Sequence, residues 1–234
     1  MNDNSVEFAR LTGRDESELV QVGELRMHCR VRPDWQALCR TAAEAGFELA
    51  AVSAYRSFDR QLLIWNEKAR GLRDVVDDAG APVDIAALQP LEKLRAILRF
   101  SALPGASRHH WGSDFDVIDR AAIAPGYRVQ LTHTECCGNG PFAALHEWLD
   151  TLIGQHRAFG FFRPYAERAN DGEGVAPERW HLSHWPQASR MQALRSRDAM
   201  YAFYQNFEAL ELRQALLAHF DSVYRYYVCA ETAY

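Results

Sequence analysis

The chain has 234 residues, of which 48% are hydrophobic, so it is long enough to form one large domain with a sizeable core. Its formal net charge of −5 gives no general attraction to phosphate backbones or anionic lipid, which argues against a nucleic-acid-binding protein. The five cysteines are odd in number and lack paired CxxC spacing, so neither a disulfide framework nor a cysteine-type structural zinc site is expected.

The first 20 residues are polar and acidic and contain no apolar run. They therefore predict neither a signal peptide nor a membrane segment, and a cytoplasmic location is expected. A chain from which an export signal had been removed would look the same, and it would be periplasmic or extracellular. Residues 1–30 as a whole have mixed polarity and predict an extended or irregular entry segment.

Apolar periodicity, capping residues and Gly/Pro breaks divide the rest of the chain into elements. In chain order they predict a helix from Pro33 to Gly46, a buried strand at 47–55, a helix from Phe58 to Gly71, a loop at 72–90, a helix at 90–101, a strand at 114–119, an amphipathic helix at 141–156, an aromatic strand at 158–165, a polar loop at 166–178, two helical pieces within 188–222, and a strand at 223–230. The simplest prediction is one α+β domain over 1–234, with a catalytic core at about 33–186 and a C-terminal helical extension at about 187–234.

The segment SRHHWGSDFDVID carries the first candidate chemistry. His109 and Asp116 supply an imidazole and a carboxylate, which both suit zinc. Alternation along DFDVID places Asp114 and Asp116 on the same face of the expected strand. Buried carboxylates need a cation or hydrogen bonds, so a metal is one explanation, and a surface edge strand with solvated aspartates is the other.

Two further segments could complete such a site. In PERWHLSHW, Glu178 and His181 are three residues apart, a spacing that leaves the local geometry open. A Glu beside a metal-bound His can act as a general base, although WH among aromatic residues also suits core packing.

In SAYRSFDRQ, a strand ends just before Arg56. The guanidinium of Arg56 could hold an oxyanion or a substrate carboxylate, or it could lie in an exposed ion pair.

Taken together, these motifs resemble those of the bacterial D-Ala-D-Ala carboxypeptidases and dipeptidases, a group of zinc peptidases allied to lysostaphin and the hedgehog signalling domain. The resemblance covers about residues 33–186 and keeps the family's order of motifs. The motifs are YRS with a downstream Gln (Tyr55, Arg56, Ser57, Gln61), SxHxxGxxxD (Ser107, His109, Gly112, Asp116) and ExWH (Glu178, Trp180, His181).

The resemblance implies an antiparallel sheet with flanking helices and one zinc ion, with a role for each motif residue. The implied zinc ligands are His109, Asp116 and His181. By the same resemblance, Glu178 is the base that activates water and Arg56 stabilises the developing oxyanion. The implied substrate contacts are Ser107 and Gln61.

This sequence departs from the family pattern at Asp114, where a small apolar residue is usual, and at Arg179, where Pro is common. Asp114 could orient a ligand His, bind a substrate amine or alter the metal preference. His110 and His184 are expected to support the site or the core rather than to bind metal.

The implied substrate is a peptidoglycan fragment or another D-Ala-containing peptide, cleaved as by a D-Ala-D-Ala carboxypeptidase or dipeptidase. One alternative is an endopeptidase that cuts L-to-D bonds within the stem peptide, and another is a non-catalytic zinc-containing binding module. A redox or metal sensor built on Cys136 and Cys137 is a third possibility, although ordinary reduced thiols are the simpler prediction for this pair. No pattern predicts the oligomeric state.

Overall fold

The computed structural model describes residues 5–165 and 173–229, and its centre is an antiparallel sheet of four strands in the order β3-β4-β6-β5. These strands are β3 (Leu49–Ser53), β4 (Asp114–Asp119), β5 (Phe161–Phe162) and β6 (His181–His184). Strand β4 lies inside the sheet between β3 and β6, and all six of its residues are buried. The prediction of a strand over 114–119 is confirmed, and the alternative of a solvated edge strand is wrong.

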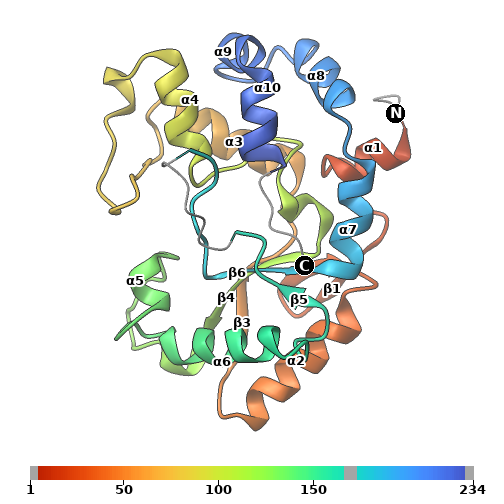
Figure 1. The fold of residues 1–234 in the computed structure, drawn as a ribbon, viewed down its shortest axis with the longest axis vertical. Coiled ribbons are helices and arrows are strands. Elements are labelled where there is room, and N and C mark those ends of the chain that lie inside the picture. The colour runs from red at the N-terminus through yellow and green to blue at the C-terminus, as the bar shows by residue number, and fades with distance from the viewer. Residues whose placement is uncertain (1–4, 166–172, 230–234) are drawn as a thin grey trace.

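One face of the sheet packs against α2 (Arg32–Glu44) and α6 (Ala143–Gly154), which lie together on one side of it (Figure 1). The contact is apolar because β4 turns Phe115 and Val117 toward this side. The ring of Phe115 stacks on Trp35 of α2 with centroids 4.7 Å apart. The alternation of β4 therefore leaves its aspartates for the opposite face.

A second hydrophobic cluster lies on the other side of the molecule and is built mainly from helices (Figure 1). These are α1 (Val6–Leu11), α3 (Phe58–Ala69), α4 (Pro90–Leu98), α7 (Trp185–Leu194), α8 (Arg197–Gln205), α9 (Arg213–Ala218) and α10 (Phe220–Val223). Residues from before and after position 187 share this cluster. The C-terminal helices are therefore packed against helices of the predicted catalytic core.

The C-terminal region is helical, as predicted, but its details differ. Residues 188–222 were predicted to form two helical pieces, whereas the structure has four helices between 185 and 223. The predicted strand at 223–230 is wrong: Tyr224–Val228 is a π-helical turn, and Ala230 lies outside the described residues. The Tyr224 ring packs on Phe220 one helical turn earlier, with centroids 5.8 Å apart, so contact with the cluster overrides the alternating pattern.

The expectation of an extended or irregular entry segment is only partly correct, because a helix precedes the extended strands of this region. Helix α1 is capped by Ser5, whose Oγ accepts a hydrogen bond from Phe8 N, and it buries Phe8 in the helical cluster. An antiparallel hairpin follows, made of β1 (Leu19–Val22) and β2 (Leu25–His28). These elements are short and gain their stability from tertiary contacts, which explains why local pattern did not reveal them.

The remaining short elements complete the chain. They are three 3₁₀ helices, η1 (Ile85–Ala87), η2 (Arg108–Trp111) and η3 (Arg120–Ala122), and helix α5 (His133–Cys136). The aromatic strand predicted at 158–165 is reduced to the two residues of β5. Of the polar loop predicted at 166–178, residues 166–172 lie outside the described residues.

The five cysteines are free thiols, as predicted for Cys136 and Cys137. Within the described residues no helix has both the length and the apolar character needed to cross a membrane.

Candidate metal centre and catalytic site

Strand β4 and its neighbour β6 place two metal-ligand candidates directly opposite each other. Asp116 pairs with His181 in the antiparallel register, so their side chains project from adjacent strands on the same face. Asp114 pairs with Ser183 two residues along. The sheet thus brings together residues that are 65 positions or more apart in the sequence, on the face that α2 and α6 do not cover.

The third candidate, His109, reaches the same place from the 3₁₀ helix η2. That helix ends at Gly112, which has the left-handed φ of 63°, and a Cβ there would lie 2.7 Å from the backbone nitrogen of His28. Glycine is thus required both by the conformation and by the close approach of strand β2. Nδ1 of His109 lies 2.7 Å from the carbonyl oxygen of Ala54 and donates to it, which leaves Nε2 as the lone-pair nitrogen facing the site.

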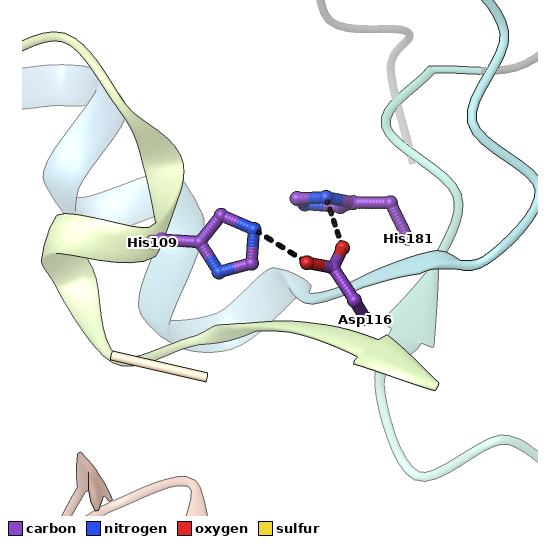
Figure 2. Close-up of side chains that lie close together, drawn as sticks. All are labelled: His109, Asp116 and His181. Atoms are coloured by element: carbon purple, nitrogen blue, oxygen red, sulfur yellow. Dashed lines mark ion pairs between the residues drawn. The ribbon is translucent and has the colours of Figure 1, made fainter. Parts of the chain in front are cut away.

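These three side chains form a buried group that can hold one metal ion, with their ligand atoms all within 4.8 Å of one another. Figure 2 shows both imidazole rings directed at the Asp116 carboxylate, one toward each of its oxygen atoms. His109 Nε2 lies 3.3 Å from Oδ2 of Asp116, and His181 Nδ1 lies 3.3 Å from Oδ1. Two ligand atoms bound to one tetrahedral zinc are about 3.4 Å apart, given bond lengths of about 2.1 Å.

The surroundings of the three metal-ligand candidates also favour a bound cation. His181 Nδ1 is buried and has no hydrogen-bond partner, which is costly for a polar atom unless a cation completes it. Burial opposes ionisation of Asp116, but His109 and His181 outweigh it and hold the pKa of this carboxyl below its usual value. The prediction of a one-ion site at these three residues therefore agrees with the structure.

Glu178 stands beside the metal group without belonging to it. The backbone N–H of His181 donates to the carbonyl of Glu178, 3.0 Å away, which closes a turn just before β6 begins. The turn resolves the geometry that the spacing of three left open, because it brings both side chains to the same side. Glu178 Oε2 lies 3.4 Å from His181 Nδ1, and its side chain is 13% exposed. A carboxylate in this place can reach a water at the metal position.

Arg56 lies between β3 and α3, as predicted, and its guanidinium is held on two sides. Nη1 donates to Gln61 Oε1 at 2.9 Å and Nη2 donates to Ser53 Oγ at 3.1 Å. Its backbone N–H donates to the carbonyl of His109 at 3.0 Å, which joins the Arg56 segment to the metal-binding one. Burial lowers the pKa of Arg56, while the charges of Asp116 and Glu178 raise it. A fixed cation therefore faces the acidic side of the site.

The three predicted substrate contacts are all inside the protein. Gln61 is fully buried, and its Nε2 donates to the carbonyl of Ala102 while its Oε1 accepts from Arg56. Asp114 is also fully buried, and Ser107 is 2% exposed at the start of η2. The polar atoms of Gln61 and Asp114 already have internal partners, and their role as substrate contacts stays a prediction. Gln61 supports Arg56.

The two histidines expected not to bind metal are accounted for by other partners. His110 Nε2 accepts from the backbone N–H of Gly105 at 3.0 Å, and Nδ1 donates to the carbonyl of Arg56 at 2.6 Å. Burial lowers the pKa of His110 to about 3, so the ring stays neutral. His184 Nε2 lies 2.9 Å from Oδ2 of Asp34 in α2. Both rings fix neighbouring segments around the site.

Sequence reasoning missed Arg108, which lies in η2 next to His109 and is 2% exposed. Its Nε donates to Asp114 Oδ1 at 2.8 Å, and its guanidinium lies over the Trp111 ring. A buried arginine beside a buried aspartate on the next strand could have been suspected, since each charge needs the other. Only the folded chain shows that they meet.

Comparison with known proteins indicates which family the sequence resembles. A family model described as VanY, D-alanyl-D-alanine carboxypeptidase, matches residues 24–187. Two uncharacterized proteins of Haemophilus influenzae are also similar. One is 41% identical over 98 residues, covering 40% of this chain and 67% of that protein, and the other is 26% identical over 126 residues, covering 54% and 92%.

Solved structures are similar at the level of the fold. VanYB in complex with D-alanine-D-alanine is 21% identical, with a TM-score of 0.51 and coverage of 85% of this chain and 87% of that chain. The LdcB LD-carboxypeptidase is also 21% identical, with a TM-score of 0.50 and coverage of 86% and 78%. The predicted fold class, an antiparallel sheet with flanking helices, is confirmed.

Proposed function

The chain belongs to the VanY family of D-alanyl-D-alanine carboxypeptidases, and on that premise we propose that it is a zinc-dependent peptidase that removes a terminal D-alanine from peptidoglycan-derived peptides or splits D-Ala-D-Ala. The observation that carries the proposal is the buried group of His109, Asp116 and His181, whose ligand atoms lie within 4.8 Å of one another and can hold one metal ion. Three protein ligands leave a fourth position open, which is the arrangement of catalytic zinc sites.

Zinc held by these residues would supply a water molecule with a pKa near 7 and would polarise the scissile carbonyl. The Glu178 carboxylate would accept a proton from a water held at this position and would pass that proton to the departing amine. Arg56 donates from its guanidinium to the carbonyl oxygen as negative charge develops there. Gln61 and Ser53 keep the guanidinium in one orientation, so little reorganisation is needed during the reaction.

Glu178 also favours an enzyme over a purely structural zinc module. A structural site has no need of a carboxylate that approaches the metal group without joining it. The approach of Glu178 to His181 and the hydrogen bond that holds Arg56 both support a role in hydrolysis. If the chain lies in the cytoplasm, as the sequence predicts, soluble precursors or recycled wall fragments would be its substrates.

The proposal is tested by incubating the zinc-loaded protein with D-Ala-D-Ala, a muropeptide pentapeptide and a tetrapeptide, with products identified by mass spectrometry. A Glu178→Ala variant with the same zinc content is the control. We expect loss of one D-alanine, or splitting of the dipeptide, with the wild type alone. An internal cut would make the chain an endopeptidase, and cleavage of none of the three despite one bound zinc would favour a binding module.

A further inference from the structure

Asp114 lies directly behind the metal group and makes three hydrogen bonds although it is fully buried. Its Oδ1 accepts from Arg108 Nε at 2.8 Å and from His181 Nε2 at 3.0 Å. Its Oδ2 accepts from Ser113 Oγ at 2.6 Å. A buried carboxylate without such partners would cost several kcal/mol, so these three donors are what allow the charge of Asp114 to lie inside the protein.

The contact with His181 determines which ring nitrogen is free. An ionised carboxylate only accepts hydrogen bonds, so the nitrogen that faces Asp114 must carry the proton. That nitrogen is Nε2, so Nδ1 is the nitrogen whose lone pair would be available to a bound zinc ion. Nδ1 is the atom that faces Asp116 and has no hydrogen-bond partner. The two nitrogens of the His181 ring thus have different roles, and the hydrogen bond to Asp114 determines which nitrogen has which role.

Arg108 extends this arrangement across the site. It stands beside His109 in η2, its Nε contacts Asp114 on β4, and its Nη2 donates to Ser183 Oγ on β6 at 2.5 Å. One buried guanidinium therefore connects the three segments that carry the metal-ligand candidates. It also supplies the positive charge that Asp114 needs inside the protein.

We propose that Asp114, neutralised by Arg108, is a positioning residue for the metal site: it fixes the tautomer and ring orientation of His181, so that Nδ1 is presented to the zinc. The inference rests on the proposed function and goes beyond it, because it assigns the outer partner of one ligand. A carboxylate hydrogen-bonded to a ligand histidine also makes the ring a stronger donor, and loss of such a partner typically lowers metal affinity or activity about 10- to 100-fold.

Asp114→Asn tests the inference because it keeps the size of the side chain and removes its charge. Its amide can turn a donor toward His181, which would favour a proton on Nδ1 and block metal binding. Asp119→Asn is the matched control: Asp119 lies on the same strand, but its Oδ1 accepts from the backbone of Glu48 and Ala121 instead. Zinc affinity is measured by competition with a chromophoric chelator, and melting temperatures verify that the variants fold.

We expect Asp114→Asn to bind zinc about 10- to 100-fold more weakly and, at saturating zinc, to have a reduced kcat with KM little changed. Asp119→Asn should match the wild type in both. Zinc affinity and kcat of Asp114→Asn within twofold of the wild type would overturn the inference and leave the proposed function standing. A wild type that binds no zinc would instead refute the proposed function, and the inference with it.

Nitrogen-15 NMR of the histidines in the zinc-loaded wild type provides a second test that needs no variant at Asp114. A His181→Gln variant assigns the His181 signals by their disappearance. We expect His181 to show a protonated Nε2 and a metal-bound Nδ1. The opposite assignment, with the proton on Nδ1, would overturn the inference even if Asp114→Asn fails to fold.

Discussion

Replacing Glu178 with Gln separates metal binding from proton transfer. The substitution keeps the length of the side chain and its capacity for hydrogen bonds, but it removes the basic oxygen that lies 3.4 Å from His181 Nδ1. Glu178 lies outside the group of three metal-ligand candidates, so the variant should retain one zinc. The loss should appear in the chemical step alone.

General acid–base catalysis by a placed carboxylate contributes about 10²- to 10⁴-fold. At about 1.36 kcal/mol per factor of ten, this corresponds to about 2.7–5.4 kcal/mol of lost transition-state stabilisation. We therefore expect kcat of Glu178→Gln to fall by at least about 100-fold. The assay is release of D-alanine at saturating zinc and substrate, with zinc content measured by atomic emission. A zinc-loaded variant with kcat within tenfold of the wild type would refute the role of Glu178 as base.

Three further predictions test the surroundings of the site. Gln61→Met removes the side-chain acceptor of the Arg56 hydrogen bond. Because hydrogen bonds to charged groups contribute about 1.5–3 kcal/mol, we expect about a tenfold loss of kcat/KM with zinc affinity unchanged, and an unchanged kcat/KM would contradict this. Trp35→Ala removes the ring stacked on Phe115, and chemical denaturation should show that the free energy of unfolding falls by about 3–5 kcal/mol. A fall below about 1 kcal/mol would mean that this contact does not stabilise the sheet. Burial, with help from nearby arginines, lowers the pKa of His146 to about 3, below the unfolded value of 6.5, so the stability it contributes is present above pH 6.5 and is lost as the pH falls from 6.5 toward 3. Relative to His146→Asn, the wild type should lose about 2 kcal/mol of unfolding free energy between pH 6.5 and pH 5, and parallel pH profiles for the two proteins would contradict this.

The sequence predicted the parts of the site that depend on local pattern and motif. Alternation in DFDVID correctly placed Asp114 and Asp116 on one face of a strand, since the period of a strand leaves no other arrangement. The break before Arg56 correctly placed it between a strand and a helix. The meeting of His109, Asp116 and His181 came from the order of motifs in a family, because no local rule relates residues so far apart in the chain.

What escaped prediction depends on tertiary contact. The turn that joins Glu178 to His181 could not be inferred from a spacing that suits a helix as well. For Asp114 the sequence left three roles open, because its partners Arg108 and His181 could not be inferred from local pattern. Residues 224–228 alternate like a strand, yet they form a helical turn because Tyr224 and Tyr227 pack on the helical cluster.

We propose that one zinc ion, held by His109, Asp116 and His181, makes this chain a D-alanine-releasing peptidase. The most direct measurement is a titration of the metal-free protein with zinc, with the release of D-alanine from the best-cleaved peptide followed at each addition. We expect no release without metal, a linear rise that ends at one equivalent of zinc, and no release from a His181→Ala variant at the same zinc concentrations. Full activity in the metal-free protein, or an unchanged rate in the His181→Ala variant, would contradict it.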